Sequence, residues 1–290
     1  MDELQASYAE CKRLNSLHGK TYFLATLLLP KSKRKYVHAL YGFARYADEI
    51  VDDLESTLTV AEKEIALATW GNKILDSLKT GSSDDAVGRA LIDTVTRFDI
   101  PHEHFEAFLH SMTMDLTVQE YQTYEDLLEY VYGSAAVIGL EMVPVLGCLD
   151  DGAYECAKKL GIAFQLANFI RDVGEDLERG RIYLPIQELA QCGVSRDMLE
   201  ARVLTPEIIA ALKFQIARVR QLQHEATPGI LLLDPSSRPC IEAASELYCG
   251  IVDEVEKIGY DIFNARAKTS TVRRLRVFIA AYVKRLSVSN

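Results

Sequence analysis

Apolar residues recur along almost the whole chain with the 3.6-residue period of an α-helix. Predicted helices cover a first segment up to about His18 and residues 32–53, 60–79, 101–116, 124–147, 151–178, 195–227 and 239–259. No alternating strand pattern of useful length and no internal repeat is present. The pattern therefore predicts an all-α fold, with residues 1–290 forming a single domain of about ten helices around a central cavity.

The helix predicted over 124–147 is strongly apolar and carries small residues near its middle, from Gly133 to Ala136 and again at Gly139. Small side chains leave room either for a closely packed neighbouring helix or for a ligand. Both alternatives stay open at this point.

Two pairs of aspartates stand four residues apart within apolar helical segments, Asp48 with Asp52 and Asp172 with Asp176. Residues four apart lie on one face of a helix. Asn168 continues the face of the second pair toward the N-terminus, as does Gln165. The second row therefore offers oxygen ligands only. Oxygen ligands suit Mg²⁺, whereas zinc prefers sulfur and imidazole ligands.

Basic and aromatic side chains accompany these aspartates. Tyr41 and Arg45 share the face of Asp48, and Arg171 precedes Asp172. A DxxxD pair usually marks a solvated helix face, and a structural ion-pair network would also explain the arginines. Carboxylates in an apolar context must be protonated, paired or metal-bound. Two such pairs favour metal ions on two walls of a cavity.

The ligand that requires both walls is a diphosphate, whose departure leaves concentrated negative charge for metal ions and arginine to stabilise. Apolar walls suit a hydrocarbon chain and a carbocation shielded from water. The aromatic faces of Tyr41, Tyr130 and Tyr248 can stabilise a passing cation, although core packing is the commoner role of a tyrosine.

The amino-acid composition limits the classes of partner that the protein is expected to bind. The formal net charge of −10 argues against nucleic acid as a partner and against general affinity for anionic lipid. Six cysteines without CxxC pairing read as reduced thiols. No secretory signal and no run of about 18 apolar residues is visible. We expect a cytoplasmic protein with no membrane-spanning segment.

Four segments together resemble the squalene/phytoene synthase family of head-to-head prenyl transferases, in the family's order from about Tyr8 to Phe263. They read HGKTYFLATLLLP, YGFARYADEIVDD, YVYGSAAVIG and FQLANFIRDVGEDLERGRIYLP. The last motif is highly specific, and with GKTYFLAT it is most similar to bacterial phytoene synthases. The resemblance implies the all-α isoprenoid-synthase bundle. It also implies condensation of two allylic diphosphates through a cyclopropylcarbinyl diphosphate, with geranylgeranyl diphosphate as the substrate of phytoene synthases.

The resemblance also assigns residues. The two metal-binding motifs of the family are matched by Asp48, Asp52, Asn168, Asp172 and Asp176. The implied ion is Mg²⁺, with Mn²⁺ as the alternative. The residues matching substrate-contacting positions are His18, Thr21, Tyr41, Arg45, Tyr130, Gln165, Asn168, Arg171 and Tyr248. The implied catalytic set is Tyr41, Arg45, Asp48, Asp52, Asp172, Asp176 and Tyr248. Thr21 stands where relatives often have serine, and Ala167 where many phytoene synthases have threonine.

Three other functions stay open. The first is the same chemistry on farnesyl diphosphate, giving dehydrosqualene or, with NADPH, squalene. The second is a relative diverted to secondary metabolism, which prenylates an aromatic acceptor or cyclises one prenyl chain. The third is a non-catalytic scaffold, which the intact aspartates disfavour.

The last segment, TVRRLRVFIAAYVKRL, is basic and amphipathic. It could dock peripherally on a membrane that supplies the lipid substrate. Alternatively, Arg273, Arg274 or Arg276 could reach the diphosphate, or the segment could simply be solvated. The sequence carries no indication of an oligomeric state.

Overall fold

The computed structural model describes residues 2–52 and 57–288, and the side chains of Asp52 and Val288 lie outside that description. Its elements are α1 (Glu3–His18), α2 (Lys20–Thr26), α3 (Lys31–Asp52), α4 (Val60–Thr80), α5 (Ala86–Phe98), α6 (His102–Thr117), α7 (Tyr124–Val131), the π-helical η1 (Tyr132–Ala136), α8 (Val137–Leu146), α9 (Gly152–Glu178), α10 (Ile186–Gln191), α11 (Arg196–Glu200), α12 (Pro206–Ala226), the 3₁₀-helical η2 (Thr227–Leu232), α13 (Arg238–Cys249), α14 (Ile251–Lys257) and α15 (Thr271–Val288). The described residues contain no strand, only two isolated β-bridges. The all-α class is confirmed.

The predicted number of about ten helices is wrong, because the described residues form fifteen α-helices. The additional elements are mostly short, such as α10, α11 and α14. Helices of five to seven residues complete fewer than two turns. Their apolar positions therefore do not repeat often enough for a period to be recognised.

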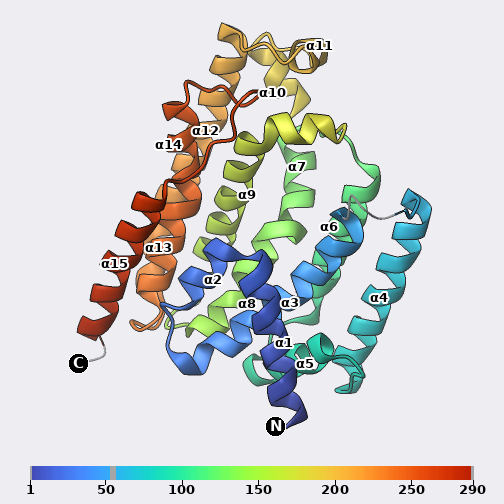
Figure 1. The fold of residues 1–290 in the computed structure, drawn as a ribbon, viewed down its shortest axis with the longest axis vertical. Helices are drawn as coiled ribbons and strands as arrows, with labels where there is room; N and C mark the ends of the chain where they lie inside the picture. Colours follow the sequence, from blue (N-terminus) through green and yellow to red (C-terminus); the bar gives the residue numbers. More distant parts are fainter. Residues whose placement is uncertain (1, 53–56, 289–290) are drawn as a thin grey trace.

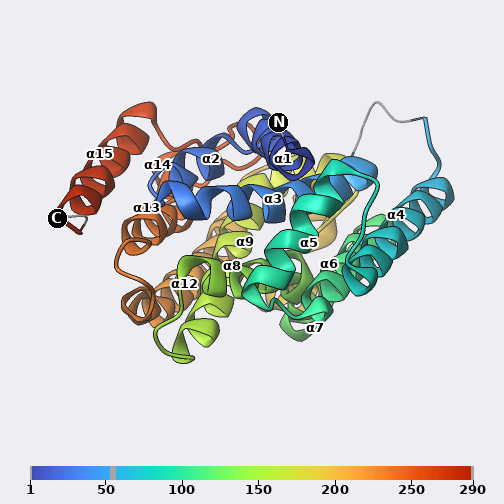
Figure 2. The same ribbon diagram turned by 90° about the horizontal axis from the view of Figure 1, so that it is seen from below.

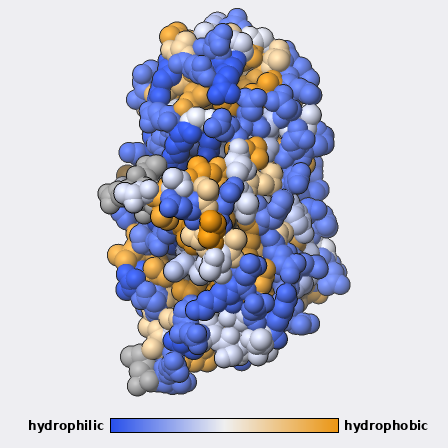
Figure 3. Space-filling model, turned by 90° about the vertical axis from the view of Figure 1, so that its right-hand side faces the viewer, coloured by the Kyte–Doolittle hydropathy of each residue, from blue (hydrophilic) through white to orange (hydrophobic). Residues whose placement is uncertain are grey.

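Helix α9 lies in the middle of the bundle and packs against α8, α12, α13 and α14. Figures 1 and 2 show α12, α13 and α15 on one side of it and α4, α5 and α6 on the other. Two apolar cores result, and Ile241 of α13 packs against both. The face on which α4 lies is mainly hydrophilic, with apolar side chains in scattered patches (Figure 3).

Local sequence signals set several helix ends. Thr59 and Glu62 form a capping box at the start of α4, and Thr123 and Asp126 form another at the start of α7. Each box satisfies backbone N–H groups that a first helical turn leaves unpaired. Pro101 directly precedes α6, which confirms the predicted start of that helix.

The small residues in the middle of the predicted 124–147 helix allow close helix packing. A Cβ atom added to Gly133 would lie 2.1 Å from the carbonyl oxygen of Ala107 on α6. One added to Gly161 of α9 would lie 2.6 Å from the carbonyl oxygen of Ala135. The π-helical turn η1 is therefore held between α6 and α9, and α8 continues from it along the cavity described below.

One helical run among the described residues, Tyr124–Leu146, is long and apolar enough to cross a membrane, judged by length and composition alone. Of its most apolar window, 56% is buried against the rest of the fold. Such burial is typical of a core helix.

Candidate active site

An apolar cavity of about 250 Å³ lies between α2, α8, α9, η2 and α13. Small residues of α9, such as Ala153, Ala157 and Gly161, make room for it. Tyr248 of α13 lines the cavity and stacks on Phe164 of α9, with ring centroids 4.9 Å apart. The cavity that the sequence predicts is present. Its walls offer few polar groups, so they suit a hydrocarbon and exclude water.

Asp172 lies on α9 two turns beyond the lining residue Phe164, about 12 Å farther along the helix axis. Arg171 Nε donates to Asp172 Oδ1 at 2.8 Å, and its Nη2 bonds the other carboxylate oxygen. Arg266 Nη2, from the connection between α14 and α15, lies 3.0 Å from Oδ1. The side chain of Asp172 is only 17% exposed. The arginines balance the charge of this half-buried carboxylate, and each could instead bind a phosphate.

Asp176 lies one turn further along α9 and is 9% exposed. Its Oδ2 atom and the Oδ1 atom of Asn168 are buried and accept no hydrogen bond. Burial, and secondarily the negative charge of Asp172, raises the pKa of Asp176 to about 7. Buried oxygen atoms without partners are unfavourable unless a cation or proton satisfies them. The donor set of Asn168, Asp172 and Asp176 therefore fits a hard divalent cation.

Helix α3 supplies the second group of predicted residues. Arg45 Nε lies 3.1 Å from Glu49 Oε1, and His18 Nε2 lies 3.7 Å from the same oxygen. Asp48 is half-buried on this helix. The side chain of Asp52 lies outside the described residues. Glu49, which the sequence analysis did not select, is thus an ion-pair partner of both Arg45 and His18.

Electrostatic interactions connect Tyr248 of α13 with Tyr41 of α3 and with Arg171 of α9. Burial, and then the neighbouring Tyr41, raises the pKa of Tyr248 to about 12, and the positive charge of Arg171 opposes that rise. Tyr41 also packs against Tyr22 of the cavity wall, with ring centroids 5.4 Å apart. Tyr41 of α3 therefore lies beside the cavity, near Tyr248, which also neighbours Arg171 of α9.

Tyr130 occupies a separate, buried position. Its hydroxyl donates to Asp115 Oδ2 at 3.0 Å, and the hydroxyl of Tyr183 donates to Oδ1 at 2.7 Å. Arg181 Nη2 donates to the backbone carbonyl of Asp115 at 2.7 Å. Burial raises the pKa of Tyr130 well above its ordinary value, so the phenol keeps its proton. The predicted contact of Tyr130 with substrate stays a prediction.

The remaining predicted residues lie at different depths. Gln165 and Asn168 are half-buried on α9, whereas His18 is exposed at the end of α1. Thr21 lines a small groove with Arg274 and Phe278 of α15. The structure therefore places Thr21 between α2 and α15, outside the residues that line the apolar cavity.

Sequence reasoning missed Arg266, Asp115 and Tyr183. Arg266 belongs to an irregular connection, where no periodicity gives its side chain a direction. Asp115 stands alone on α6, 15 residues before the tyrosine whose hydroxyl it accepts. The GRIYLP segment after α9 was the available signal for Tyr183, because it follows the acidic motif directly.

Among residues 2–52 and 57–288, no three His, Cys, Asp or Glu side chains cluster closely enough to form a ready-made metal site. The candidate set on α9 instead combines two carboxylates with an amide oxygen. These three oxygen ligands alone do not complete the coordination of a divalent ion, so further ligands would have to come from another element or from a bound molecule.

Comparison with known proteins identifies the family. The chain matches the squalene/phytoene synthase family over residues 16–273. It is 36% identical over 284 residues to the 15-cis-phytoene synthase of Synechococcus elongatus, covering 94% of this chain and 91% of the relative. It is 36% identical over 287 residues to chloroplastic phytoene synthase 1 of Arabidopsis thaliana, covering 97% and 67%.

Solved structures share the fold. A dehydrosqualene synthase with a bound ligand superposes with a TM-score of 0.88 at 28% identity, covering 98% of each chain. A squalene synthase from Alicyclobacillus acidocaldarius gives a TM-score of 0.82 at 26% identity, covering 90% of this chain and 97% of the other. The resemblance that the sequence motifs indicated is confirmed, and this chain belongs to the squalene/phytoene synthase family.

Proposed function

We propose that residues 1–290 form one catalytic domain, a prenyltransferase that condenses two geranylgeranyl diphosphates head to head. The proposed intermediate is prephytoene diphosphate and the product is phytoene, with release of diphosphate. The observation that carries the proposal is the pair of unpartnered buried oxygens of Asp176 and Asn168, on the same helix whose Phe164 lines the apolar cavity. The phytoene synthases among the relatives support the choice of reaction.

The proposed ion is Mg²⁺, with Mn²⁺ as the alternative, and the family's dependence on a divalent metal supports it. The residues that would hold it are Asp48 and Asp52 of α3 and Asn168, Asp172 and Asp176 of α9. When bound, the ion would neutralise the negative charge that develops on the departing diphosphate.

The chain's own side chains would perform the remaining tasks. Arg171 and Arg266, which now pair with Asp172, would donate to phosphate oxygens once the carboxylate has another partner. The apolar cavity would hold the prenyl chain and keep water from the cation. Tyr41 and Tyr248 would stay protonated and present ring faces to that cation.

A second candidate is the same chemistry on farnesyl diphosphate. The structural similarity to a dehydrosqualene synthase favours it, at 28% identity over 98% of the chain. The two candidates share the ionising site and differ only in the length of prenyl chain that the cavity accepts.

One experiment separates the candidates. Purified protein is incubated with Mg²⁺ and either the C15 or the C20 allylic diphosphate, and products are identified by mass. We expect a C40 hydrocarbon from the C20 substrate. A C30 product formed exclusively from the C15 substrate would favour the second candidate, and the absence of any hydrocarbon or released diphosphate with both would contradict the proposed reaction.

The proposed product is a hydrocarbon without a polar group, which has to enter a lipid phase. Peripheral contact between a cytoplasmic enzyme and a membrane, which the sequence suggests for the basic C-terminal segment, therefore belongs to the proposal.

A further inference from the structure

Helix α15 lies at the edge of the molecule and packs on it from one side only (Figures 1 and 2). Val277 and Ala281 are buried, and Phe278 packs against one of the two cores. The neighbours of α15 are α13 and, across a small groove, α2. The opposite face of α15 therefore points away from the fold.

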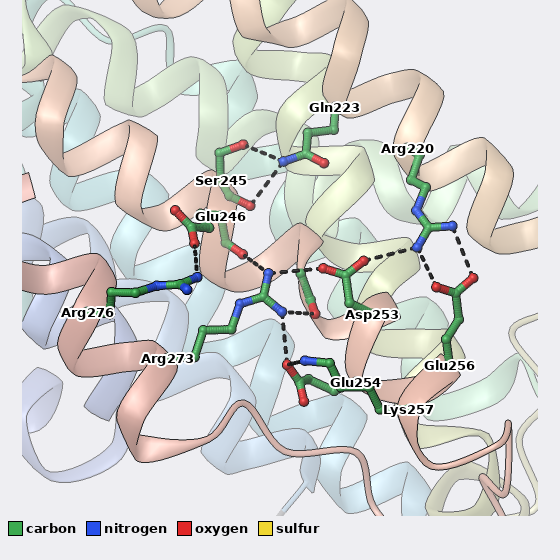
Figure 4. A network of polar contacts seen from close by, with 11 residues as sticks. Arg220, Gln223, Ser245, Glu246, Asp253, Glu254, Glu256, Lys257, Arg273 and Arg276 are labelled. Carbon is green, nitrogen blue, oxygen red and sulfur yellow. Dashed lines mark hydrogen bonds and ion pairs between the residues drawn. The ribbon is translucent and has the colours of Figure 1, made fainter. Parts of the chain in front are cut away.

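Ion pairs fix the rotation of α15 about its own axis. Arg273 bonds Asp253 Oδ2 at 3.0 Å and Glu254 Oε1 at 2.9 Å, as Figure 4 shows. Arg276 reaches Glu246 of α13 at 3.5 Å. Arg273 and Arg276 therefore turn toward α13 and α14, and the alternative in which they bind the substrate diphosphate is not favoured.

With that rotation, the outer face of α15 carries a continuous apolar stripe. We call it the α15 stripe, and it consists of Val272, Leu275, Ile279, Tyr282, Val283 and Leu286, which are 43–77% exposed. Their spacing of three and four residues keeps them on one side of the helix. Other large exposed apolar side chains are spread one or two to an element over the described residues. Leu24 of α2, which is 42% exposed, lines the groove between α2 and α15 together with Phe278.

The charge of α15 contrasts with that of the whole chain. The helix contains four arginines and one lysine but no acidic residue, although the formal net charge is −10. At 100° per residue, Arg276 borders the stripe on one side and Arg285 lies toward the other. Glu242 and Glu246 of α13 pair with Lys284 and Arg276 on the inner flank. The Arg276 pair is an exposed, weak one that can exchange partners.

The spacing of the stripe would also suit a helix from a second copy of this chain. Pairing two identical helices along it would place only basic charged residues of α15 beside the seam in either orientation, because the helix contains no acidic residue. Like charges beside such a seam disfavour the pair. The surface therefore fits a partner that is both apolar and negatively charged.

We propose that the α15 stripe docks on an anionic lipid surface, with its apolar side chains inserted at the headgroup boundary and with Arg276 and Lys284, whose ion pairs are exposed, against lipid phosphates. This surface is separate from the candidate active site, and the inference rests on and deepens the peripheral membrane contact of the proposed function. The acidic net charge of the chain does not exclude such contact, because the basic residues that attract the lipid are concentrated on one helix.

The test is co-sedimentation of the full chain with vesicles of phosphatidylcholine alone or mixed with phosphatidylglycerol. We expect the wild type to bind the mixed vesicles in a salt-sensitive manner. A variant with Leu275→Ser, Ile279→Ser and Val283→Ser should lower the vesicle-bound fraction about ten-fold. A matched control, Val60→Ser with Ile65→Ser, changes exposed apolar residues of α4 and should bind as the wild type does.

A second variant, Arg276→Ser with Lys284→Ser, leaves the stripe intact and should also weaken binding to mixed vesicles. It keeps the test decisive if the triple variant fails to fold, as judged by thermal unfolding. Equal binding to both kinds of vesicle, no binding at all, or unchanged binding by either variant would overturn the proposal. So would a dimer in solution that the stripe substitutions dissociate. Vesicle binding is measured without substrate, so failure of the proposed reaction would leave this result unaffected.

Discussion

The two acidic helices of the candidate site carry the same DxxxD spacing, but their surroundings differ. On α9, Asp172 is held by Arg171 and Arg266, and Asp176 is buried with an unpartnered oxygen. On α3, Arg45 pairs with Glu49, one residue beyond the half-buried Asp48. The α9 wall is thus arranged before any ligand arrives. The α3 wall lies at a helix end, where a bound ion would complete it.

The comparison indicates a division of tasks. Buried oxygens on α9 favour a cation strongly because nothing else satisfies them. We expect Asp48, which is half-buried near the end of α3, to approach the ion together with the substrate. The first prediction, with the largest expected effect, tests whether both walls are needed.

Asp172→Asn or Asp176→Asn should lower turnover about 1000-fold, because each removes a charged ligand of the proposed ion. Asp48→Asn should cause a comparable loss if α3 contributes to the same ion. The measurement is diphosphate release with saturating Mg²⁺. Asp84→Asn, an exposed aspartate outside both walls, serves as the matched control and should turn over normally. Wild-type turnover in the α9 variants would remove the metal assignment.

The aspartates of the two walls should also differ in how they affect the pH dependence of stability. In the metal-free protein, the pKa of Asp176 is raised from 3.8 to about 7. The native state therefore binds more protons than the unfolded state between those values, and stability falls as pH rises from about 4 to 7. Asp176→Asn should remove up to about 4 kcal/mol of this fall, measured by denaturant unfolding. Asp48→Asn should retain it, and an unchanged slope in Asp176→Asn would contradict the account.

Glu141 of α8 is a third buried carboxylate for comparison, because it is fully buried without belonging to either wall. Both carboxylate oxygens lack a partner, and burial alone raises its pKa to about 8. Glu141→Met should stabilise the protein by about 2–3 kcal/mol at pH 9, where the unfavourable charge would otherwise form. Metal affinity should not change. Weaker metal binding in this variant would mean that a buried carboxylate outside the two walls takes part in the site.

Arg266→Ala should have the smallest effect. Its side chain is 43% exposed, so losing its ion pairs should cost less than about 1 kcal/mol of stability. Its loss should raise KM about ten-fold if it transfers from Asp172 to a phosphate. Arg196→Ala is the control, because Arg196 is equally exposed and pairs with surface glutamates. An unchanged KM in Arg266→Ala would confine the residue to a structural role.

The sequence predicted those features that repeat along one helix. The row Asn168, Asp172 and Asp176 follows from spacing alone, and the structure places it on one helix near an apolar cavity. Contacts between distant segments were not predictable in this way. The approach of Arg266 to Asp172 depends on the path of an irregular connection, and that of Tyr130 to Asp115 depends on the packing of α7 against α6.

The most direct test of the central claim is a crystal of the protein with Mn²⁺ and a non-hydrolysable prenyl thiodiphosphate, examined by anomalous diffraction. We expect manganese peaks between α3 and α9, coordinated by oxygens of Asp48, Asp172 and Asp176 and of the diphosphate. A diphosphate held by arginines alone, with no peak between the two helices, would contradict the central claim.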